Sequence, residues 1–317
     1  MGQPTASDVH VDQILSNISI KYKNRLYIGE KIFPLVRSEK QSDKYYLFPL
    51  SEWFRDEAKK RAPGSASEGG GFPLSDDTFF CEERSFHTQL EDEVLKNADS
   101  VLRIEANKTD FVTEKILIRL ERVVADMCFT AGNWSNSVTL SGTNQWSDYD
   151  NSDPIANLET GIDAVEDATG MPVNTIVIGK SVWRKIKHHP QLLDRLPSTG
   201  LKTATVATLR DLLQNGDEAP IRIMVGNALY NNAKRGADDS LTQIWGKHVW
   251  LGHVAEAPAR ETPSAGYTFY WPVEGQIRGV RRWREEKIHS DIIEAFMNFD
   301  DKVVSADLGY VIRDAVA

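Results

Sequence analysis

The chain has 317 residues, of which 41% are apolar and 26% are charged, as is ordinary for a soluble globular protein. Its formal net charge is −9, which argues against a protein that coats nucleic acid, because neutralising phosphates requires clustered Lys and Arg. The length is sufficient for about two domains with substantial cores.

The cysteines and the N-terminus indicate no secretion and no membrane insertion. Cys81 and Cys128 stand in unrelated contexts and form neither a disulfide framework nor a zinc-binding pattern, which suits a reducing cytosol. The N-terminus lacks the basic start and apolar core of a signal peptide. No apolar run approaches the roughly 18 residues of a membrane span.

Residues 1–35 predict an extended N-terminal arm with little capacity for a core of its own. Its local charge is positive, from Lys21, Lys23, Arg25 and Lys31 against Glu30. Two interpretations stay open. The arm is either a strap that meets a neighbouring subunit or the nucleic acid, or a solvated terminal segment.

Residues 43–86 predict a long two-stranded arm. A strand-like run from Lys44 leads through a helix-compatible piece, 51–61, to a Gly-rich tip at 63–71, and a second extended run returns to Phe86. A lone hairpin is marginal in water, and two strands cannot bury both of their own faces. We therefore expect the arm to lie across another copy of the protein; folding back onto its own domain is the alternative. Its aromatic residues are Tyr45, Tyr46, Phe48, Trp53, Phe54, Phe72, Phe79, Phe80 and Phe86.

The strongest helix signal covers residues 109–131. Thr109 and Asp110 offer an N-cap, Gly132 offers a stop, and no Gly or Pro lies between them. Apolar residues repeat at helical spacing along this segment: Val112, Ile116, Leu120, Val123 and Met127. The residues before this helix, 88–105, are expected to be polar and irregular.

A compact α/β unit is predicted after a polar connection at 133–153. Pro154 starts a helix that reaches Thr169, with Gly170 as its stop. A buried strand at 175–178, helices at 181–188 and 205–214, and a strand at 221–225 follow. This alternation of strands and helices indicates a second domain at about 154–262.

The C-terminal part reverts to strands, which we expect at 244–254, 267–271, 276–288, 291–298, 302–304 and 308–312. The ribbon at 276–288 has a basic stretch, Arg281 to Arg284, that is followed directly by two glutamates. An intersubunit ion-pair strip is the favoured interpretation. A nucleic-acid contact and a solvated strand face are the alternatives.

No motif predicts catalysis, cofactor binding or metal binding. The stretch 175–181 imitates a phosphate-binding loop, but Asn174 occupies the position of its first glycine. His188 and His189 are adjacent and lack a carboxylate or Cys at ligand spacing. Cys81 and His87 could form a nucleophile pair only by tertiary coincidence. We expect a protein that is not an enzyme and has no cofactor.

The order of these segments resembles the tailed-phage major capsid proteins with the Hong Kong 97 fold over essentially the full chain. The stretches similar to that family are Lys44-Tyr45-Tyr46, Trp53 to Ala58, Arg61 to Gly64, Gly69 to Phe72, Lys302-Val303-Val304 and Asp307 to Tyr310. None of these stretches contains a catalytic motif. Together they are specific for the family, whereas each one alone is not.

The resemblance implies an α+β protein with the Hong Kong 97-type capsid fold. Its parts are expected to be an N-terminal arm at 1–35, an extended β-hairpin loop at 36–87, a peripheral domain at 88–153 and 263–317 with the spine helix at 109–131, and an inserted axial domain at 154–262. It implies pentamers and hexamers that form an icosahedral shell around packaged double-stranded DNA, which the protein encloses without sequence-specific binding. The chain would then be part of the virion, assembled in the host cytoplasm.

The resemblance also implies portal and scaffolding proteins as partners, and decoration proteins as possible further ones, with no membrane. Some family members crosslink a loop Lys to an Asn of a neighbour; Lys44, Lys59 and Lys60 are available here, but no acceptor motif matches. An autocatalytic Lys–Asn crosslinking shell protein and a nucleic-acid-binding module are the alternatives. The residues expected at intersubunit contacts are Tyr46, Phe48, Trp53, Phe54, Arg55, Arg61, Lys115, Arg119, Arg122, Arg281, Arg282 and Arg284.

Overall fold

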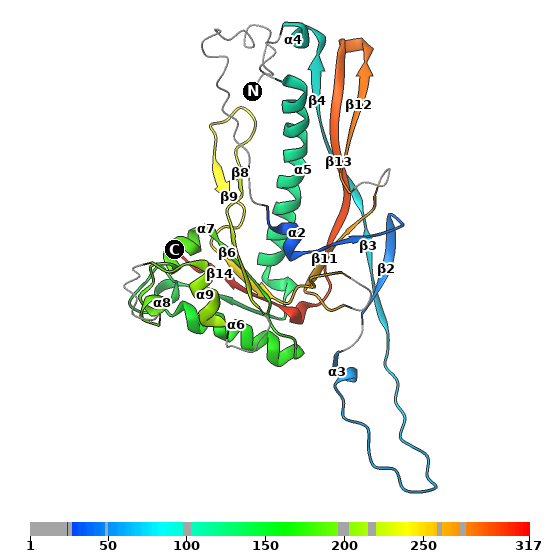
Figure 1. Cartoon of the computed structure of the whole chain (residues 1–317), viewed down its shortest axis with the longest axis vertical. Helices are drawn as coiled ribbons and strands as arrows, with labels where there is room; N and C mark the ends of the chain where they lie inside the picture. The colour runs from blue at the N-terminus through cyan, green and yellow to red at the C-terminus, as the bar shows by residue number, and fades with distance from the viewer. Residues whose placement is uncertain are drawn as a thin grey trace.

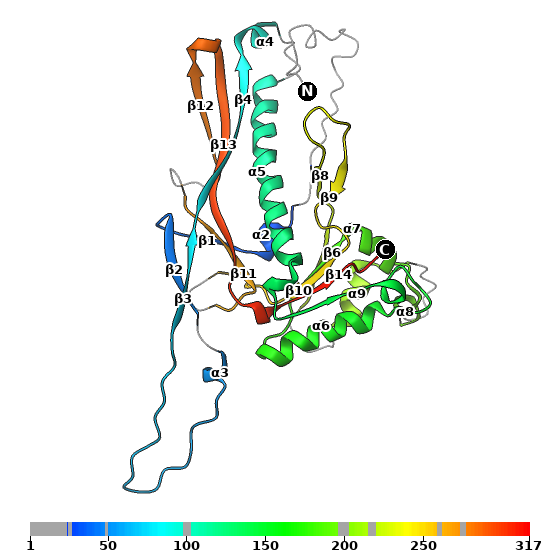
Figure 2. The ribbon, with the colours of Figure 1, turned by 180° about the vertical axis from the view of Figure 1, so that it is seen from behind.

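The computed structural model describes residues 24, 27–47, 50–97, 103–195, 203–214, 220–258, 262–272 and 277–317. The molecule is elongated along the helix α5 (Ile104–Phe129) (Figure 1). Strands run beside this helix, a smaller unit of helices and strands lies against its lower end, and an extension projects beyond that end (Figures 1 and 2). Most of the predicted N-terminal arm, 1–23, and Phe48 lie outside the described residues.

Helix α5 is the predicted spine helix, although it begins earlier than residue 109 and ends before residue 131. Its 26 residues give a rod of about 39 Å. Side chains beyond the helix bind its last carbonyl groups: Asn133 Nδ2 donates to Met127 O and Trp134 Nε1 donates to Cys128 O, both at 2.9 Å. These bonds satisfy acceptors that a helix end leaves open, so the helix stops before Gly132 is reached.

The sheet beside α5 is built around one long strand, β13 (Ser290–Val303). One edge of β13 pairs with β4 (Glu82–Glu91), and the other pairs first with β12 (Gly279–Glu285) and then with β11 (Gly266–Tyr270), which also pairs with β1 (Leu35–Arg37). Alternate residues of β13 share a core with the apolar stripe of α5: Ile293, Ala295, Met297 and Phe299 with Val112, Ile116, Leu120 and Val124.

A second sheet, in the order β5-β14-β10-β6-β7, forms the smaller unit. Its strands are β5 (Asn136–Thr139), β14 (Gly309–Arg313), β10 (Val249–Gly252), β6 (Thr175–Gly179) and β7 (Arg222–Gly226). One face packs on α5 through Val177, Trp250 and Val311. The other face lies under the helices α6 (Pro154–Thr169), α7 (Lys180–Ile186), α8 (Pro190–Asp194) and α9 (Val206–Leu213).

Helix α6 confirms its sequence prediction. Asp153 Oδ1 accepts hydrogen bonds from the backbone N–H groups of Ile155 and Ala156 at 3.0 and 3.1 Å, and Pro154 occupies the first turn. Gly170 ends the helix with φ at 67°, a conformation that favours glycine. Gly161 lets the helix approach the sheet, because a Cβ there would lie 2.8 Å from a methyl group of Leu251.

The extension is two-stranded only at its base. Strand β2 (Ser42–Leu47) pairs with β3 (Ser75–Phe80). The helix-compatible piece forms a single short helix, α3 (Leu50–Trp53), and the described residues between it and β3 contain no further helix or strand. The two predicted strands therefore pair at the base, but the pairing ends at Leu47, short of the predicted strand end at residue 50, and the helix-compatible piece at 51–61 is helical only as far as Trp53.

Two further expectations need correction. Residues 88–105 are not irregular: β4 continues to Glu91, and the helix α4 (Asp92–Asn97) follows. The polar sequence of β4 is held in the sheet by its pairing with β13 and by Leu90, which is buried. The strands β5 and β14 come from segments that the sequence analysis grouped with the spine helix. They lie in the second sheet, where β14 pairs with β5 on one side and with β10 on the other.

The remaining elements are short. Helix α2 (Gly29–Ile32) packs on α5, and a hairpin of β8 (Leu229–Asn231) and β9 (Leu241–Gln243) rises beside α5 (Figure 1). Turns of 3-10 helix occur at Ala131–Asn133, Gly142–Asn144, Glu286–Ile288 and Ala306–Leu308. Within the described residues, no helix combines the length and the apolar character needed to cross a membrane.

Candidate intersubunit surfaces

Strand alternation divides the aromatic residues of the extension into anchored and exposed ones. At the base, Phe79 stacks on Phe269 of β11 with ring centroids 4.3 Å apart, and Tyr45 stacks on the same ring at 5.4 Å. Their strand neighbours Tyr46 and Phe80 point the other way and are exposed, because successive side chains of a strand face opposite sides. The base of the extension is thus fixed to the protein's own sheet.

Beyond the base, the extension carries apolar side chains that the chain does not cover. Trp53 is 61% exposed and Phe54 is 67% exposed, and Phe72 and Leu74 on the returning segment are also exposed. The rings of Trp53 and Phe72 lie 5.3 Å apart. Large apolar side chains exposed close together are typical of surfaces that contact another molecule, and an intersubunit contact here stays a prediction.

The ion pairs of Arg55 and Lys59 join residues of the extension to one another. Arg55 Nη2 lies 2.8 Å from Glu52 Oε1, and Lys59 Nζ lies 3.3 Å from Glu68 Oε2. Arg61 is exposed. These exposed pairs contribute little to stability, and an intersubunit contact of Arg55 or Arg61 stays a prediction.

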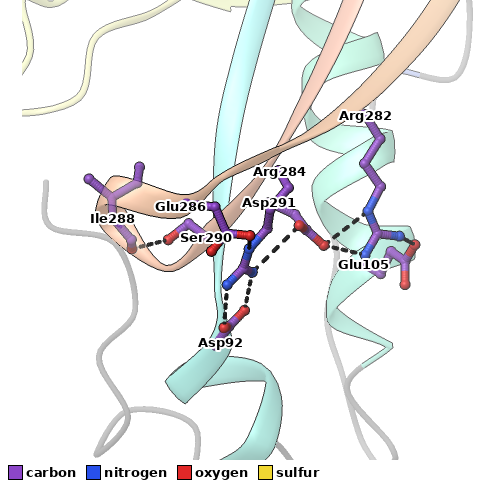
Figure 3. Close-up of polar contacts among 8 residues, drawn as sticks. All are labelled: Asp92, Glu105, Arg282, Arg284, Glu286, Ile288, Ser290 and Asp291. Atoms are coloured by element: carbon purple, nitrogen blue, oxygen red, sulfur yellow. Dashed lines mark hydrogen bonds and ion pairs between the residues drawn. The ribbon is translucent and has the colours of Figure 1, made fainter.

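The arginines of β12 form an ion-pair cluster with carboxylates of the same chain (Figure 3). Arg284 binds Asp92 with two parallel contacts, Nη1 to Oδ1 at 2.6 Å and Nη2 to Oδ2 at 2.7 Å. Arg282 binds Asp291 at 2.6 Å and also contacts Glu105 at the start of α5. Together these contacts tie β12, β13, α4 and α5 at the far end of the molecule.

The cluster shifts the pKa values of its members in opposite directions. The hydrogen bonds from Arg284 lower the pKa of Asp92, and those from Arg282 lower the pKa of Asp291. The same bonds raise the pKa values of both arginines. The groups are therefore held in their charged forms.

Arg281 points to a different set of partners. Its guanidinium lies over the ring of Phe296, 3.7 Å from the centroid, and its Nη1 is 3.6 Å from Glu83 Oε1. All three arginines of β12 thus have acidic partners within the chain. The predicted intersubunit strip is not needed to explain their pairing, and their contact with a neighbouring copy stays a prediction.

The three cationic residues named on α5 have different surroundings. Lys115 lies over the ring of Phe111 at 5.0 Å, and Arg122 lies over Tyr230 of β8 at 4.2 Å. Arg119 is exposed. Lys115 and Arg119 remain accessible on the outer face of the helix, whereas Arg122 holds the β8–β9 hairpin against it.

A buried carboxylate, missed by sequence reasoning, joins several elements. Glu121 of α5 accepts hydrogen bonds from Gly29 N at 2.7 Å, from Ile28 N at 3.0 Å and from Trp245 Nε1 at 2.6 Å. Burial raises its pKa, and these hydrogen bonds oppose that rise. A signal was present, because Glu121 interrupts the apolar stripe between Leu117 and Val124.

A second contact on the same helix holds the segment before α2. Glu114 Oε1 accepts a hydrogen bond from the hydroxyl of Tyr27 and another from Asn24 N at 3.1 Å. The side chain of Asn24 in turn exchanges two hydrogen bonds with the backbone of Leu229, at 2.9 and 3.1 Å. The described start of the chain is therefore tied both to α5 and to the β8–β9 hairpin.

The structure places the residues that the sequence analysis considered for catalysis and phosphate binding as follows. Cys81 and His87 stand six positions apart along an extended segment, about 20 Å at 3.3 Å per residue. Ser181 Oγ donates to Gly246 O at 2.6 Å, and Gly179 N donates to His248 O at 3.1 Å. Among the described residues no group of three or more His, Cys, Asp and Glu could hold a metal ion.

Comparisons with known proteins show which proteins this chain is similar to. No protein-family model matches the chain. It is 26% identical over 309 residues to the major capsid protein of Burkholderia phage BcepMu, covering 95% of both chains. It is 27% identical over 318 residues to the major capsid protein of Pseudomonas phage JBD67, covering 97% of both.

Solved structures agree with these relatives. A phage-related protein from Bordetella bronchiseptica RB50 matches with a TM-score of 0.69 and 26% identity, over 96% of this chain and 97% of that one. The capsid of cyanophage P-SCSP1u matches in fold, with a TM-score of 0.63 and 9% identity over 97% of this chain and 93% of that one. The resemblance inferred from the sequence is confirmed: the chain is a shell-forming major capsid protein of the tailed-phage kind, with the α+β Hong Kong 97-type fold.

Proposed function

We propose that copies of the chain assemble as pentamers and hexamers into an icosahedral shell that encloses packaged double-stranded DNA. The observation that carries this proposal is the extension, which leaves Trp53, Phe54 and Phe72 exposed in the single chain. Burying aromatic side chains is the main source of stabilising free energy for such a segment, at about 25 cal/mol per Å² of apolar surface. The extension can bury these side chains only by contacting another molecule.

The division into domains follows the two sheets. The proposed peripheral domain contains α5 and the sheet around β13, and the proposed axial domain contains the second sheet with α6 to α9. Because β5 and β14 pair in the second sheet, Asn136–Thr139 and Gly309–Arg313 are better assigned to the axial domain than to the peripheral one. The extension at 42–80 leaves from the peripheral sheet.

In the proposed assembly, the extension of one copy crosses α5 of its neighbour, and the N-terminal arm braces a third copy. The contacts are heterologous, so a rotation axis closes them into rings. Lys115 and Arg119 on the outer face of α5, with the extension's own Arg55 and Arg61, are the proposed polar contacts. A net charge of −9 would let enclosed DNA move during filling, since phosphates would not be held tightly.

The proposed partners are a portal protein, scaffolding proteins and decoration proteins, and assembly is proposed to take place in the host cytoplasm. The role is structural rather than enzymatic. The alternative of a Lys–Asn crosslinking shell protein predicts covalent ladders on a denaturing gel of purified particles. A nucleic-acid-binding module would instead bind DNA with steeply salt-dependent affinity.

Electron microscopy of the chain expressed with and without its genomic neighbours tests the proposal. Rings or closed particles are expected, and a monodisperse monomer in every condition would contradict it. A Trp53→Ala, Phe54→Ala, Phe72→Ala variant is expected to form few particles while keeping its fold. Lys60→Ser is the matched control, because Lys60 is exposed on the same extension and its loss removes no apolar contact area.

A further inference from the structure

The surface of α7 carries charge of one sign. Lys180, Arg184, Lys185 and Lys187 lie on or directly after the helix, and no Asp or Glu occurs between Asp167 and Asp194. Arg184 and Lys185 are exposed. Lys247 is also exposed, next to the Gly246 carbonyl that accepts a hydrogen bond from Ser181 at the start of α7.

The surface of α6 carries the opposite charge. The helix contains Glu159, Asp163, Glu166 and Asp167, and no Lys or Arg occurs between Arg122 and Lys180. Within the chain, Glu159 lies 3.4 Å from Arg195, and Glu166 accepts a hydrogen bond from Val173 N at 3.2 Å. Asp163 and Asp167 are exposed.

Within the part of the chain that the structure describes, these two surfaces are not neutralised internally. Among the described residues, Asp163, Asp167, Arg184 and Lys185 take part in no ion pair, although Arg195 pairs with Asp153 and Glu159, and Arg210 pairs with Asp211, in the same unit. Helices α6 and α7 cover different strands on the same face of the second sheet, α6 over β14 and β10 and α7 over β6 and β7, and they stand apart in both views (Figures 1 and 2). One copy therefore cannot bring its own two surfaces together.

A second copy related by a rotation axis can do so, because a heterologous contact joins two different surfaces of identical chains. Complementary potentials fix the register of such a contact and disfavour like-charge arrangements. DNA as the occupant of the α7 surface would leave the acidic surface of α6 without a counterpart. Because one unit carries both a basic and an acidic surface, a second copy of this chain is favoured as the partner that covers them.

We propose that the basic α7 surface of one copy meets the acidic α6 surface of the next copy around the same ring. Arg184 and Lys185 face Asp163 and Asp167 of the neighbour in this contact. The proposal rests on the proposed function, since it names the contact that sets the order of copies within a pentamer or hexamer. Each contact is solvent-accessible and individually weak, and repetition around the ring makes it effective.

Charge reversal tests the contact. We expect Arg184→Glu with Lys185→Glu to lower the fraction of chain in closed particles several-fold, and Asp163→Lys with Asp167→Lys to do the same. The combined four-residue variant restores opposite signs in swapped positions and is expected to recover assembly. Lys234→Glu with Arg235→Glu, a double reversal at exposed residues between β8 and β9, is the control for the net charge of the first variant, and circular dichroism of each variant checks that the fold is kept.

The outcomes separate this inference from the proposed function. Suppose that the unaltered chain forms particles and that the combined variant assembles no better than the worse of the two double variants. The proposed contact is then wrong, while the proposed shell-forming function is unaffected. Normal assembly of both of these double variants would also overturn the contact, as would loss of retained DNA from intact particles of the Arg184→Glu, Lys185→Glu variant. If the unaltered chain forms no particles, the proposed function itself fails.

Discussion

Trp245 donates its indole N–H to the buried carboxylate of Glu121 at 2.6 Å, and this bond connects the spine helix α5 with the loop that leads to the second sheet. The same carboxylate holds the backbone N–H groups of Ile28 and Gly29. A single side chain thus fixes the N-terminal segment, α5 and the smaller unit relative to one another.

We predict that Trp245→Phe lowers the free energy of unfolding by about 1–3 kcal/mol, because it leaves a buried acceptor oxygen of Glu121 without that donor. Trp250→Phe is the matched control. Both indoles are fully buried, but the Trp250 N–H has no hydrogen-bond partner within the described structure. Urea unfolding of the unassembled chain measures both changes, and equal losses for the two variants would contradict the role of Glu121.

Asp301 predicts a pH dependence of stability. Its side chain is buried on β13, where Oδ1 accepts a hydrogen bond from Thr268 at 2.5 Å and Oδ2 has no partner. Burial raises its pKa to about 7; nearby Asp300 also raises it, whereas Arg84 and Arg119 lower it. The carboxyl also faces the buried Cys128 of α5.

Because this pKa is raised on folding, its contribution to stability is fully present below the unfolded value of 3.8 and is lost as the pH rises to about 7. The stability difference between the parent chain and Asp301→Asn should therefore fall between pH 5 and pH 7, by at most about 1.4 kcal/mol per pH unit. Urea titrations at pH 5, 6, 7 and 8 check this. A difference that does not change with pH would contradict the assignment.

The pair of Arg284 and Asp92 predicts a local effect at the far end of the molecule. Replacing Arg284 with Lys removes the two parallel contacts that hold α4 beside β12, since an ammonium cannot reproduce the planar fork. Hydrogen exchange of the amides in Asp92–Asn97 should become faster, with little change in global stability. Lys287→Ala, in the adjacent turn, should leave this exchange unchanged, and a similar acceleration in both variants would refute the prediction.

The sequence predicted the parts of the fold whose signals are local. Helix α6 begins and ends where its cap, its Pro and Gly170 indicate, and β6, β7, β11 and β14 correspond to predicted strands. Helix α5 was found from its apolar spacing. Its end was misplaced because the acceptors there bind the side chains of Asn133 and Trp134, contacts that no local pattern encodes.

Long-range contacts account for what the sequence did not predict. The sequence predicted an extended run only as far as Phe86, and β4 continues to Glu91 because this polar segment pairs with β13. The arginines of β12 looked free because Asp92 and Glu105 are far away in the sequence. The exposure of Trp53 and Phe54 agrees with the expectation of an arm that the chain cannot cover, whereas the partner of that arm is a property of the assembly.

The central claim is that another copy covers the extension in the assembled shell. Cys81 and Cys128 are buried, so a cysteine introduced as Phe54→Cys provides an exposed thiol against an unreactive background. The rate of its modification by a maleimide, measured in the unassembled chain and in purified particles, tests the claim most directly. We predict rapid labelling of the unassembled chain and strong protection in particles; equal rates in the two states would contradict the account.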